Sequence, residues 1–191
     1  APKGYAWIFP KGEDCANVGL GIGGDVSGEH LRAIDYLKAF VHERFPAGKV
    51  IAEMYGAVPL SGPIHESVAD GLVLVGDAAR HVNPLTGGGI IYAIQAGELA
   101  GDVVAHAIQE KDVSKQRLME YETRWRKEFG KRLETGLKAK NFLFKLSDED
   151  LNTLAHSLQG VELKELSTWA LLTELIHRNP KLLFGLAKLL L

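Results

Sequence analysis

Hydrophobic and polar positions divide the chain into a first part with short apolar runs and a second part with helical periods. The first 25 residues predict a hairpin, because the runs GYAWIF and ANVGLGI flank the turn PKGEDC. Residues 27–45 repeat apolar positions every three or four residues and stop before Pro46, which predicts a helix. Residues 49–60 predict a further strand, and GLVLV at 71–75 predicts a strand buried on both faces.

The remainder of the chain is predicted to be helical. Small residues recur at spacings of three or four between residues 86 and 110, which predicts a helix that approaches another element closely. A long amphipathic pattern covers residues 114–145. The run SDED at 147–150 predicts a helix N-cap with acids in the first turn, and shorter helices follow up to a break at Pro180.

Composition narrows the range of functions. The 191 residues are 46% hydrophobic and 24% charged, with a formal net charge of −2, which indicates a folded chain without the basic face of a nucleic-acid binder. Cys15 is the single cysteine, so the chain forms no internal disulfide, and we find no metal-ligand spacing. The apolar C-terminal run KLLFGLAKLLL is too short to span a bilayer. We expect a cytoplasmic protein, with peripheral membrane contact left open.

The run GLGIGG at 19–24 matches the dinucleotide fingerprint G-x-G-x-x-G letter for letter. That fingerprint also requires a helix that opens at the glycines. Here DVSGEH follows, and we expect the helix to start near Ser27. We therefore interpret the run as a glycine-rich strand end and not as a pyrophosphate site.

The segment GDAARHVNPLTGGGI, residues 76–90, has the strand–loop–helix context that the first run lacks. Asp77 follows the predicted strand, Pro84 sets a turn, and Gly87, Gly88 and Gly89 leave main-chain N–H groups unscreened before a helix. We expect Gly88 to exclude a side chain, because a β-carbon there would either project toward the bound ligand or force a strained turn, since glycine alone enters positive φ cheaply. The residues alone leave two interpretations open: a cradle for an anion or carbonyl, or a plain link with Asp77 as a cap.

Residues 76–100 resemble the second flavin-binding motif of the FAD-dependent hydroxylase-like superfamily. The resemblance implies that Asp77 binds the ribityl chain and that Pro84, Gly87, Gly88 and Gly89 face the pyrophosphate and the flavin ring. The run YAWIFPK at 5–11 is similar to the signature of geranylgeranyl reductases, which include archaeal enzymes that saturate the isoprenoid chains of membrane lipids.

This family resemblance implies a fold, a reaction and a division of the chain. The fold is α+β or α/β, with part of a substrate-binding antiparallel sheet in residues 1–70, a flavin-binding segment in 71–110 and a helical region in 111–191. The cofactor is FAD, reduced by NADPH or ferredoxin, and the reaction reduces prenyl double bonds. Members of the family begin with a unit that carries G-x-G-x-x-G, so we expect this chain to be the C-terminal portion of a reductase.

Substrate and catalytic residues are less well defined. Tyr5, Trp7 and Phe9 alternate along one strand face, and the resemblance makes them an aromatic wall for an isoprenoid tail, while the residues alone also fit an ordinary packed face. Lys11 is a candidate partner for a phosphate head group, with a solvated turn lysine as the alternative. No catalytic residue is assigned: His81 is the titratable group nearest to the flavin loop in sequence, and a simple loop histidine is the favoured interpretation.

Two other functions stay open at this point. One is an aromatic monooxygenase of the same superfamily, which would insert oxygen instead of saturating a prenyl chain. The other is a non-catalytic lipid-binding fragment, because half of the cofactor site is expected to lie outside this chain.

Overall fold

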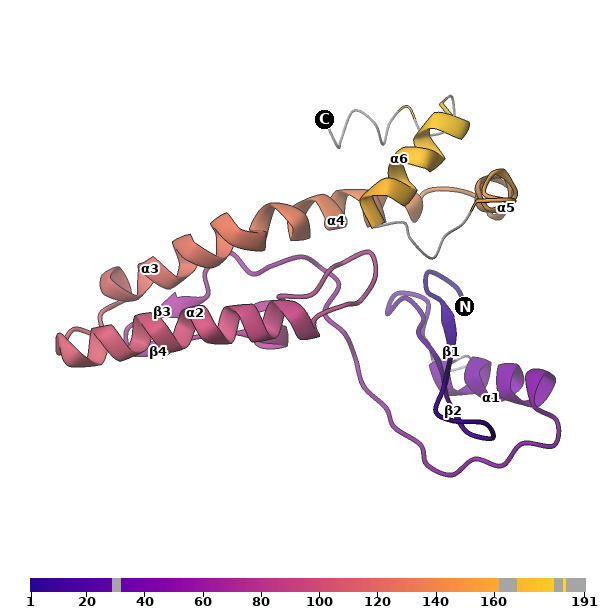
Figure 1. Cartoon of the computed structure of the whole chain (residues 1–191), viewed down its shortest axis with the longest axis horizontal. Helices are drawn as coiled ribbons and strands as arrows, with labels where there is room; N and C mark the ends of the chain where they lie inside the picture. Colours follow the sequence, from indigo (N-terminus) through magenta and orange to yellow (C-terminus); the bar gives the residue numbers. More distant parts are fainter. Residues whose placement is uncertain (29–31, 162–167, 181–183, 185–191) are drawn as a thin grey trace. The chain divides into compact units, whose positions relative to one another are not determined.

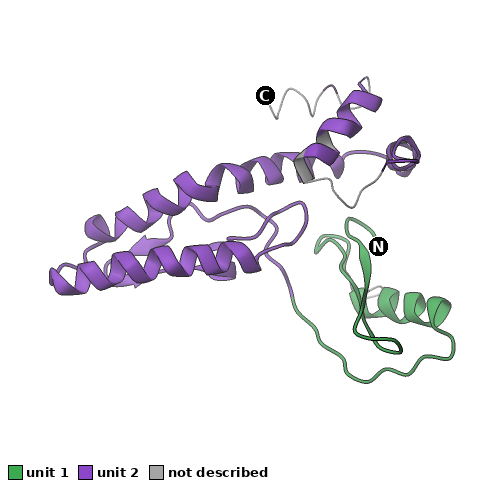
Figure 2. Cartoon of the chain, in the orientation of Figure 1, with its two compact units in different colours: residues 1–56 green, residues 57–191 purple. Residues whose placement is uncertain are grey.

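The computed structural model describes residues 1–28, 32–161, 168–180 and 184, together with the secondary structure and most side chains within these ranges. The chain forms two compact units, residues 1–56 and residues 57–191, which are coloured separately in Figure 2. We call them the hairpin unit and the helical unit and describe each by itself. The predicted division at residues 70 and 110 concerns functional segments and stays a prediction.

The hairpin unit begins with the predicted pair of strands. Strand β1 (Ala6–Pro10) pairs antiparallel with β2 (Ala16–Leu20), in a register that places Trp7 opposite Gly19. This pairing confirms the predicted hairpin.

Helix α1 (Ala33–Arg44) follows β2. Its expected start near Ser27 is wrong, because Ser27 and Gly28 are not helical. The Asp35 carboxylate instead accepts a hydrogen bond from the backbone N–H of Arg32 at 2.9 Å, which satisfies a free donor at the true start of the helix.

The strand predicted over residues 49–60 is wrong. Residues 48–60 adopt no regular secondary structure, and apolar side chains such as Ile51 and Met54 are 83% and 85% exposed. The sequence has the composition of a strand, but a strand needs a neighbour to satisfy its backbone groups. No such neighbour pairs with this segment among the described residues.

The strand predicted as buried on both faces is also corrected. Only Leu72–Val73 form strand β4, which pairs antiparallel with β3 (Val68–Ala69). Leu72 is 48% exposed, because within the described residues β4 has β3 as its one strand partner. Gly71, at φ 66°, makes the tight turn between the two strands.

Four helical segments carry the main core of the helical unit. Helix α2 (Ile90–Gln109) lies beside one continuous run made of α3 (Lys115–Trp125), a π-helical turn η2 (Arg126–Gly130) and α4 (Lys131–Leu143) (Figure 1). The two helices predicted at 86–110 and 114–145 are thereby confirmed. The small side chains of α2 allow the close approach that the sequence predicted, and the core joins both helices through Ala96, Ala100, Val103, Ala107, Leu118, Tyr121, Trp125, Phe129 and Leu133.

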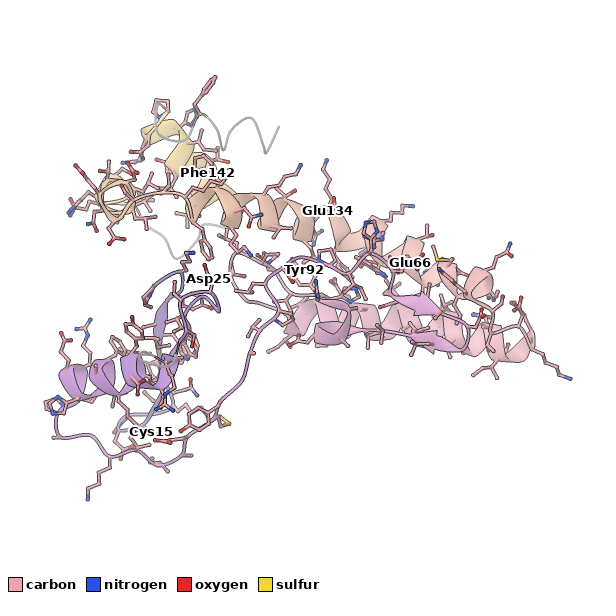
Figure 3. The ribbon with its side chains drawn as sticks, turned by 180° about the vertical axis from the view of Figure 1, so that it is seen from behind. Cys15, Asp25, Glu66, Tyr92, Glu134 and Phe142 are labelled. Carbon is pink, nitrogen blue, oxygen red and sulfur yellow. The ribbon has the colours of Figure 1, made fainter. Side chains whose placement is uncertain are left out.

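Helices α5 (Asp148–Ser157) and α6 (Thr168–Arg178) complete the described structure. The predicted N-cap is confirmed: Ser147 and Asp150 form a capping box, in which each side chain accepts a hydrogen bond from the other residue's backbone N–H. Phe142 of α4, labelled in Figure 3, packs in a second small cluster with Leu154 of α5 and Leu175 of α6. No helix in the described part of the chain is long and apolar enough to cross a membrane.

Candidate functional site

The segment that follows β4 folds back on itself before α2 begins. Residues 76–79 form a short 3₁₀ turn, η1, closed by hydrogen bonds from Arg80 N–H to the Asp77 carbonyl and from His81 N–H to the Gly76 carbonyl. Gly76 adopts φ 59°, and a β-carbon there would lie 3.3 Å from Cβ of Ala93 on α2. The glycine thus lets η1 lie directly against α2, with the Asp77 side chain exposed to solvent.

The next segment is a tight turn held by its own backbone. The N–H of Asn83 donates to the Gly88 carbonyl, and the N–H of Gly87 donates to the Asn83 carbonyl, both at 2.9 Å. The Asn83 side chain also accepts from Leu85 N–H at 2.9 Å. Pro84, which lies between Asn83 and Leu85, is buried. We call residues 83–89 the glycine turn.

The positive φ expected at Gly88 belongs to its neighbour. Gly87 has φ 74°, whereas Gly88 is not in the left-handed region. A β-carbon at Gly88 would meet only Thr86 Oγ1 at 3.4 Å, an ordinary contact. The positive φ therefore requires glycine at position 87 and not at position 88. At Gly88, the surrounding residues of this chain leave room for a side chain.

Gly89 brings the two ends of the motif together. A β-carbon on Gly89 would lie 3.4 Å from Asp77 Oδ1 and 3.1 Å from a Val82 methyl group. The carboxylate of Asp77 therefore lies beside the residue that precedes α2. No described residue forms a hydrogen bond or an ion pair with this carboxylate. The structure thus places Asp77, Pro84 and the three glycines in one loop cluster, with a carboxylate acceptor next to a helix start.

A cavity of about 440 Å³ opens beside the glycine turn, and sequence reasoning did not find its polar residues. It is lined by Asn83, residues 86–92, Gln95 and Arg132. Arg132 comes from α4, and its place is fixed by Gly136, one turn later on the same helix face. A β-carbon at Gly136 would lie 3.1 Å from Asn83 Oδ1 and from Pro84 Cδ, so the glycine lets α4 touch the turn. An isolated glycine in an amphipathic helix was the available sequence signal for this contact.

His81 is part of the core and not of the cavity lining. Its ring is fully buried, with its centroid 4.5 Å from that of Trp125 and 5.2 Å from that of Phe129. Neither ring nitrogen has a hydrogen-bond partner among the described residues. Burial lowers the pKa of His81 to about 4, with the charge of Glu122 opposing this shift and that of Arg126 adding to it. The imidazole is therefore neutral at pH 7.

The hairpin unit carries the second set of predicted site residues. The ring centroids of Tyr5 and Trp7 lie 5.7 Å apart, and those of Trp7 and Phe9 lie 6.2 Å apart, so the three rings share one strand face. Trp7 covers Gly19, where a β-carbon would lie 2.0 Å from the indole ring. The indole N–H donates to Asn17 Oδ1 at 2.8 Å, so the ring is held from both sides.

Two further sequence expectations concern the ends of the hairpin. Lys11 lies in the turn with its side chain exposed, and its backbone N–H donates to the Cys15 carbonyl at 2.7 Å. At the other end, Gly24 is followed by turn and coil and not by a helix, which agrees with the interpretation of GLGIGG as a strand end.

Comparison with known proteins adds three findings. Residues 1–58 match the family described as the geranylgeranyl reductase catalytic domain. The chain is 47% identical over its full length to digeranylgeranylglycerophospholipid reductase from Methanothrix thermoacetophila, and 49% identical over 99% of its length to the protein of the same name from Methanoculleus marisnigri. It covers 49% and 48% of these relatives, so the chain spans about half their length.

A solved structure of a reductase-like protein is also similar to this chain. The crystal structure of a geranylgeranyl bacteriochlorophyll reductase-like protein from Thermoplasma acidophilum matches 99% of this chain with a TM-score of 0.90 and 34% identity, and the chain covers 48% of that protein. The predicted mixed α and β fold and the predicted resemblance to the geranylgeranyl reductases are confirmed.

Proposed function

Since the chain resembles the geranylgeranyl reductases, we propose that it forms the C-terminal portion of an FAD-dependent reductase that saturates prenyl double bonds in isoprenoid lipids. The observation that carries this proposal is the convergence of the Asp77 carboxylate and Gly89 in one loop at the start of α2. The relatives of this chain are named as reductases of such lipids, which supports the same reaction.

The residues of the loop fit a flavin cofactor. Asp77 offers carboxylate oxygens without a partner among the described residues, which suits the ribityl hydroxyls. The glycine turn lines the cavity, but the N–H groups of Gly87 and Gly88, expected to be free, donate within the turn to the Asn83 carbonyl and to Thr86 Oγ1. The Oε1 atom of Gln95 is buried beside it without a hydrogen-bond partner among the described residues. When bound, FAD supplies the hydride chemistry, and this chain binds and orients the cofactor. Either NADPH or ferredoxin is the proposed electron donor.

The aromatic face of β1 is the proposed contact for the prenyl chain. Tyr5 and Phe9 are 52% and 59% exposed, while Trp7 between them is held by Asn17 and Gly19. A rigid, partly exposed aromatic row can cover an apolar tail and exclude water from it. Lys11, in the adjacent turn, is proposed to meet a phosphate head group. We further propose a cytoplasmic enzyme that contacts the membrane surface to reach its lipid.

Asp77→Ala tests the cofactor site. In the full-length reductase, by which we mean this chain joined to the N-terminal portion expected before it, the variant should bind FAD roughly 10- to 100-fold more weakly. A hydrogen bond to a charged group is worth about 1.5–3 kcal/mol, and that contact is lost. Titration of FAD against the apoprotein measures the change. Asp102→Ala is the matched control, because Asp102 is an exposed carboxylate on α2 that pairs with Arg124. Equal FAD affinity in both variants would contradict the assignment of Asp77 to the FAD site.

Trp7→Ala tests the substrate surface. The specificity constant should fall more for a long prenyl substrate than for a truncated one, because each buried CH₂ contributes about 0.8 kcal/mol. Flavin content should stay unchanged. Ile8→Ala is the control, since Ile8 lies on the opposite face of the same strand. Equal losses for both chain lengths would instead indicate a folding defect, and an oxygenated product would favour the monooxygenase.

A further inference from the structure

The cavity beside the glycine turn contains one cationic side chain. Arg132 reaches it from α4, one helical turn before Gly136, whose contact with Asn83 and Pro84 holds α4 against the turn. Within the described ranges, no carboxylate forms an ion pair with Arg132. By contrast, Arg117, Arg124 and Arg126 on the preceding helical segments are each paired with an acid. Arg132 therefore offers a guanidinium to whatever occupies the cavity.

Gln95 contributes the opposite kind of group, a hydrogen-bond acceptor. Its Oε1 atom is buried and accepts no hydrogen bond from any described residue, although the side chain lines the same cavity. A buried acceptor left without a donor costs about 1–3 kcal/mol, which a ligand with an N–H or O–H group would recover. Ile90, Ile91 and Tyr92 supply the apolar and aromatic part of the wall. Tyr92, labelled in Figure 3, packs its ring 5.2 Å from that of Phe129.

These two groups restrict the chemistry of the ligand. Arg132 is exposed and favours an acceptor or a negative charge, whereas the buried Gln95 Oε1 requires a donor. A fully ionised phosphate or pyrophosphate satisfies Arg132 but has no proton to give to Gln95. The pyrimidine edge of a flavin satisfies both, because an N–H lies between two carbonyl oxygens. That edge also gains negative charge when the flavin is reduced.

We propose that Gln95 and Arg132 recognise the pyrimidine edge of the flavin, and that Arg132 binds the reduced, anionic form more tightly than the oxidised form. This inference rests on the proposed function, because it requires FAD at the glycine turn. It assigns to Arg132 a role in setting the reduction potential, which the motif residues Asp77 and Gly87–Gly89 do not by themselves supply, and to Gln95 a role in binding both redox forms. A cation near a site of developing charge stabilises the charged state.

The test measures the potential of the bound flavin and the affinity of the full-length reductase for oxidised FAD. Arg132→Gln should reduce the preference for the reduced form about tenfold, which corresponds to a midpoint potential about 30 mV more negative for a two-electron couple. Arg132→Lys should retain most of the wild-type potential. Gln95→Leu should weaken the binding of both redox forms by a similar factor, because the lost hydrogen bond is present in both.

Lys131→Gln is the control, because Lys131 is the neighbouring exposed cation on α4 and does not line the cavity. Its potential should equal that of the wild type. A wild-type potential in Arg132→Gln overturns the proposal. Equal weakening of oxidised and reduced FAD by Arg132→Gln also overturns it, and would assign Arg132 to a phosphate, whose charge does not change on reduction. A wild-type protein that binds no FAD would refute the proposed function itself and this inference with it.

Discussion

Glu122→Ala is expected to lower the free energy of unfolding of the helical unit by about 2–3 kcal/mol, because it removes a buried carboxylate that accepts hydrogen bonds from Ser67 and from the partly exposed Arg126. Glu122 is 3% exposed and lies on α3. One carboxylate oxygen accepts from the backbone N–H of Ser67 at 2.8 Å and from the Ser67 hydroxyl. The other accepts from Arg126 Nε at 2.6 Å. Removal of the carboxylate leaves the buried Ser67 N–H and Arg126 Nε without their acceptor.

Glu120→Ala is the matched control for this prediction. Glu120 is exposed on the same helix and pairs with Arg117 and Arg124, so its removal should cost no more than about 1 kcal/mol. Glu122→Gln should fall between the two, because the amide oxygen still accepts from Ser67. Urea denaturation followed by circular dichroism gives all three values. A loss at Glu122→Ala no larger than at Glu120→Ala would show that the network does not hold the unit together.

The Glu122 network also positions the candidate site. Arg126 donates to the carbonyls of Ile64 and His65 at 2.9 and 2.8 Å, and Tyr121 donates to the carbonyl of Leu74 at 2.9 Å. These bonds attach the segments on both sides of the β3–β4 hairpin to α3 and η2. Asp77 lies three residues after Leu74 in the chain. The same contacts therefore fix the position of its carboxylate.

The parts of the fold that sequence predicted depend on local patterns. The helices at 90–109 and 115–143 follow from apolar spacing, and the glycine turn follows from residues that are adjacent in the chain. A motif of this kind brings Asp77 and Gly89 within reach through a short loop, so no distant contact is needed. The capping box at Ser147 is local in the same way.

The parts that sequence missed depend on distant partners. Residues 49–60 have strand composition, but pairing decides whether a strand forms, and no local signal reports the partner. Glu122 occupies one position of an amphipathic helix, and its partner Ser67 lies 55 residues away. The apolar positions Tyr121, Trp125, Phe129 and Leu133 repeat every four residues, a spacing that an α-helix also allows, so the sequence pattern did not reveal the π-helical turn at 126–130. Arg132 joins the cavity only because α4 packs on the glycine turn.

His81 should make the stability of the helical unit depend on pH. Its pKa is lowered from 6.5 to about 4 in the folded protein, chiefly by burial. Between these two values the unfolded chain binds more protons than the folded chain, so stability is retained above pH 6.5 and is lost as the pH falls toward 4. The loss attributable to His81 is about 3 kcal/mol once both states are protonated.

His81→Phe isolates this effect. Both ring nitrogens of His81 lack partners among the described residues, so an aromatic ring without them loses no hydrogen bond and keeps the contacts with Trp125 and Phe129. The variant should be about 1–3 kcal/mol more stable than the wild type at pH 7, because it removes two buried ring nitrogens without partners, and this difference should grow by about 3 kcal/mol near pH 4, since a neutral ring never needs to bury a charge. Urea midpoints at several pH values, compared as the difference between the two proteins, cancel the titration of the carboxylates that both share. His106→Gln, at an exposed position on α2, should leave the wild-type pH dependence in place. If His81→Phe retains the wild-type slope, the imidazole is protonated within the fold and must have a partner, and its place beside Glu122 would then make it an extension of that buried network.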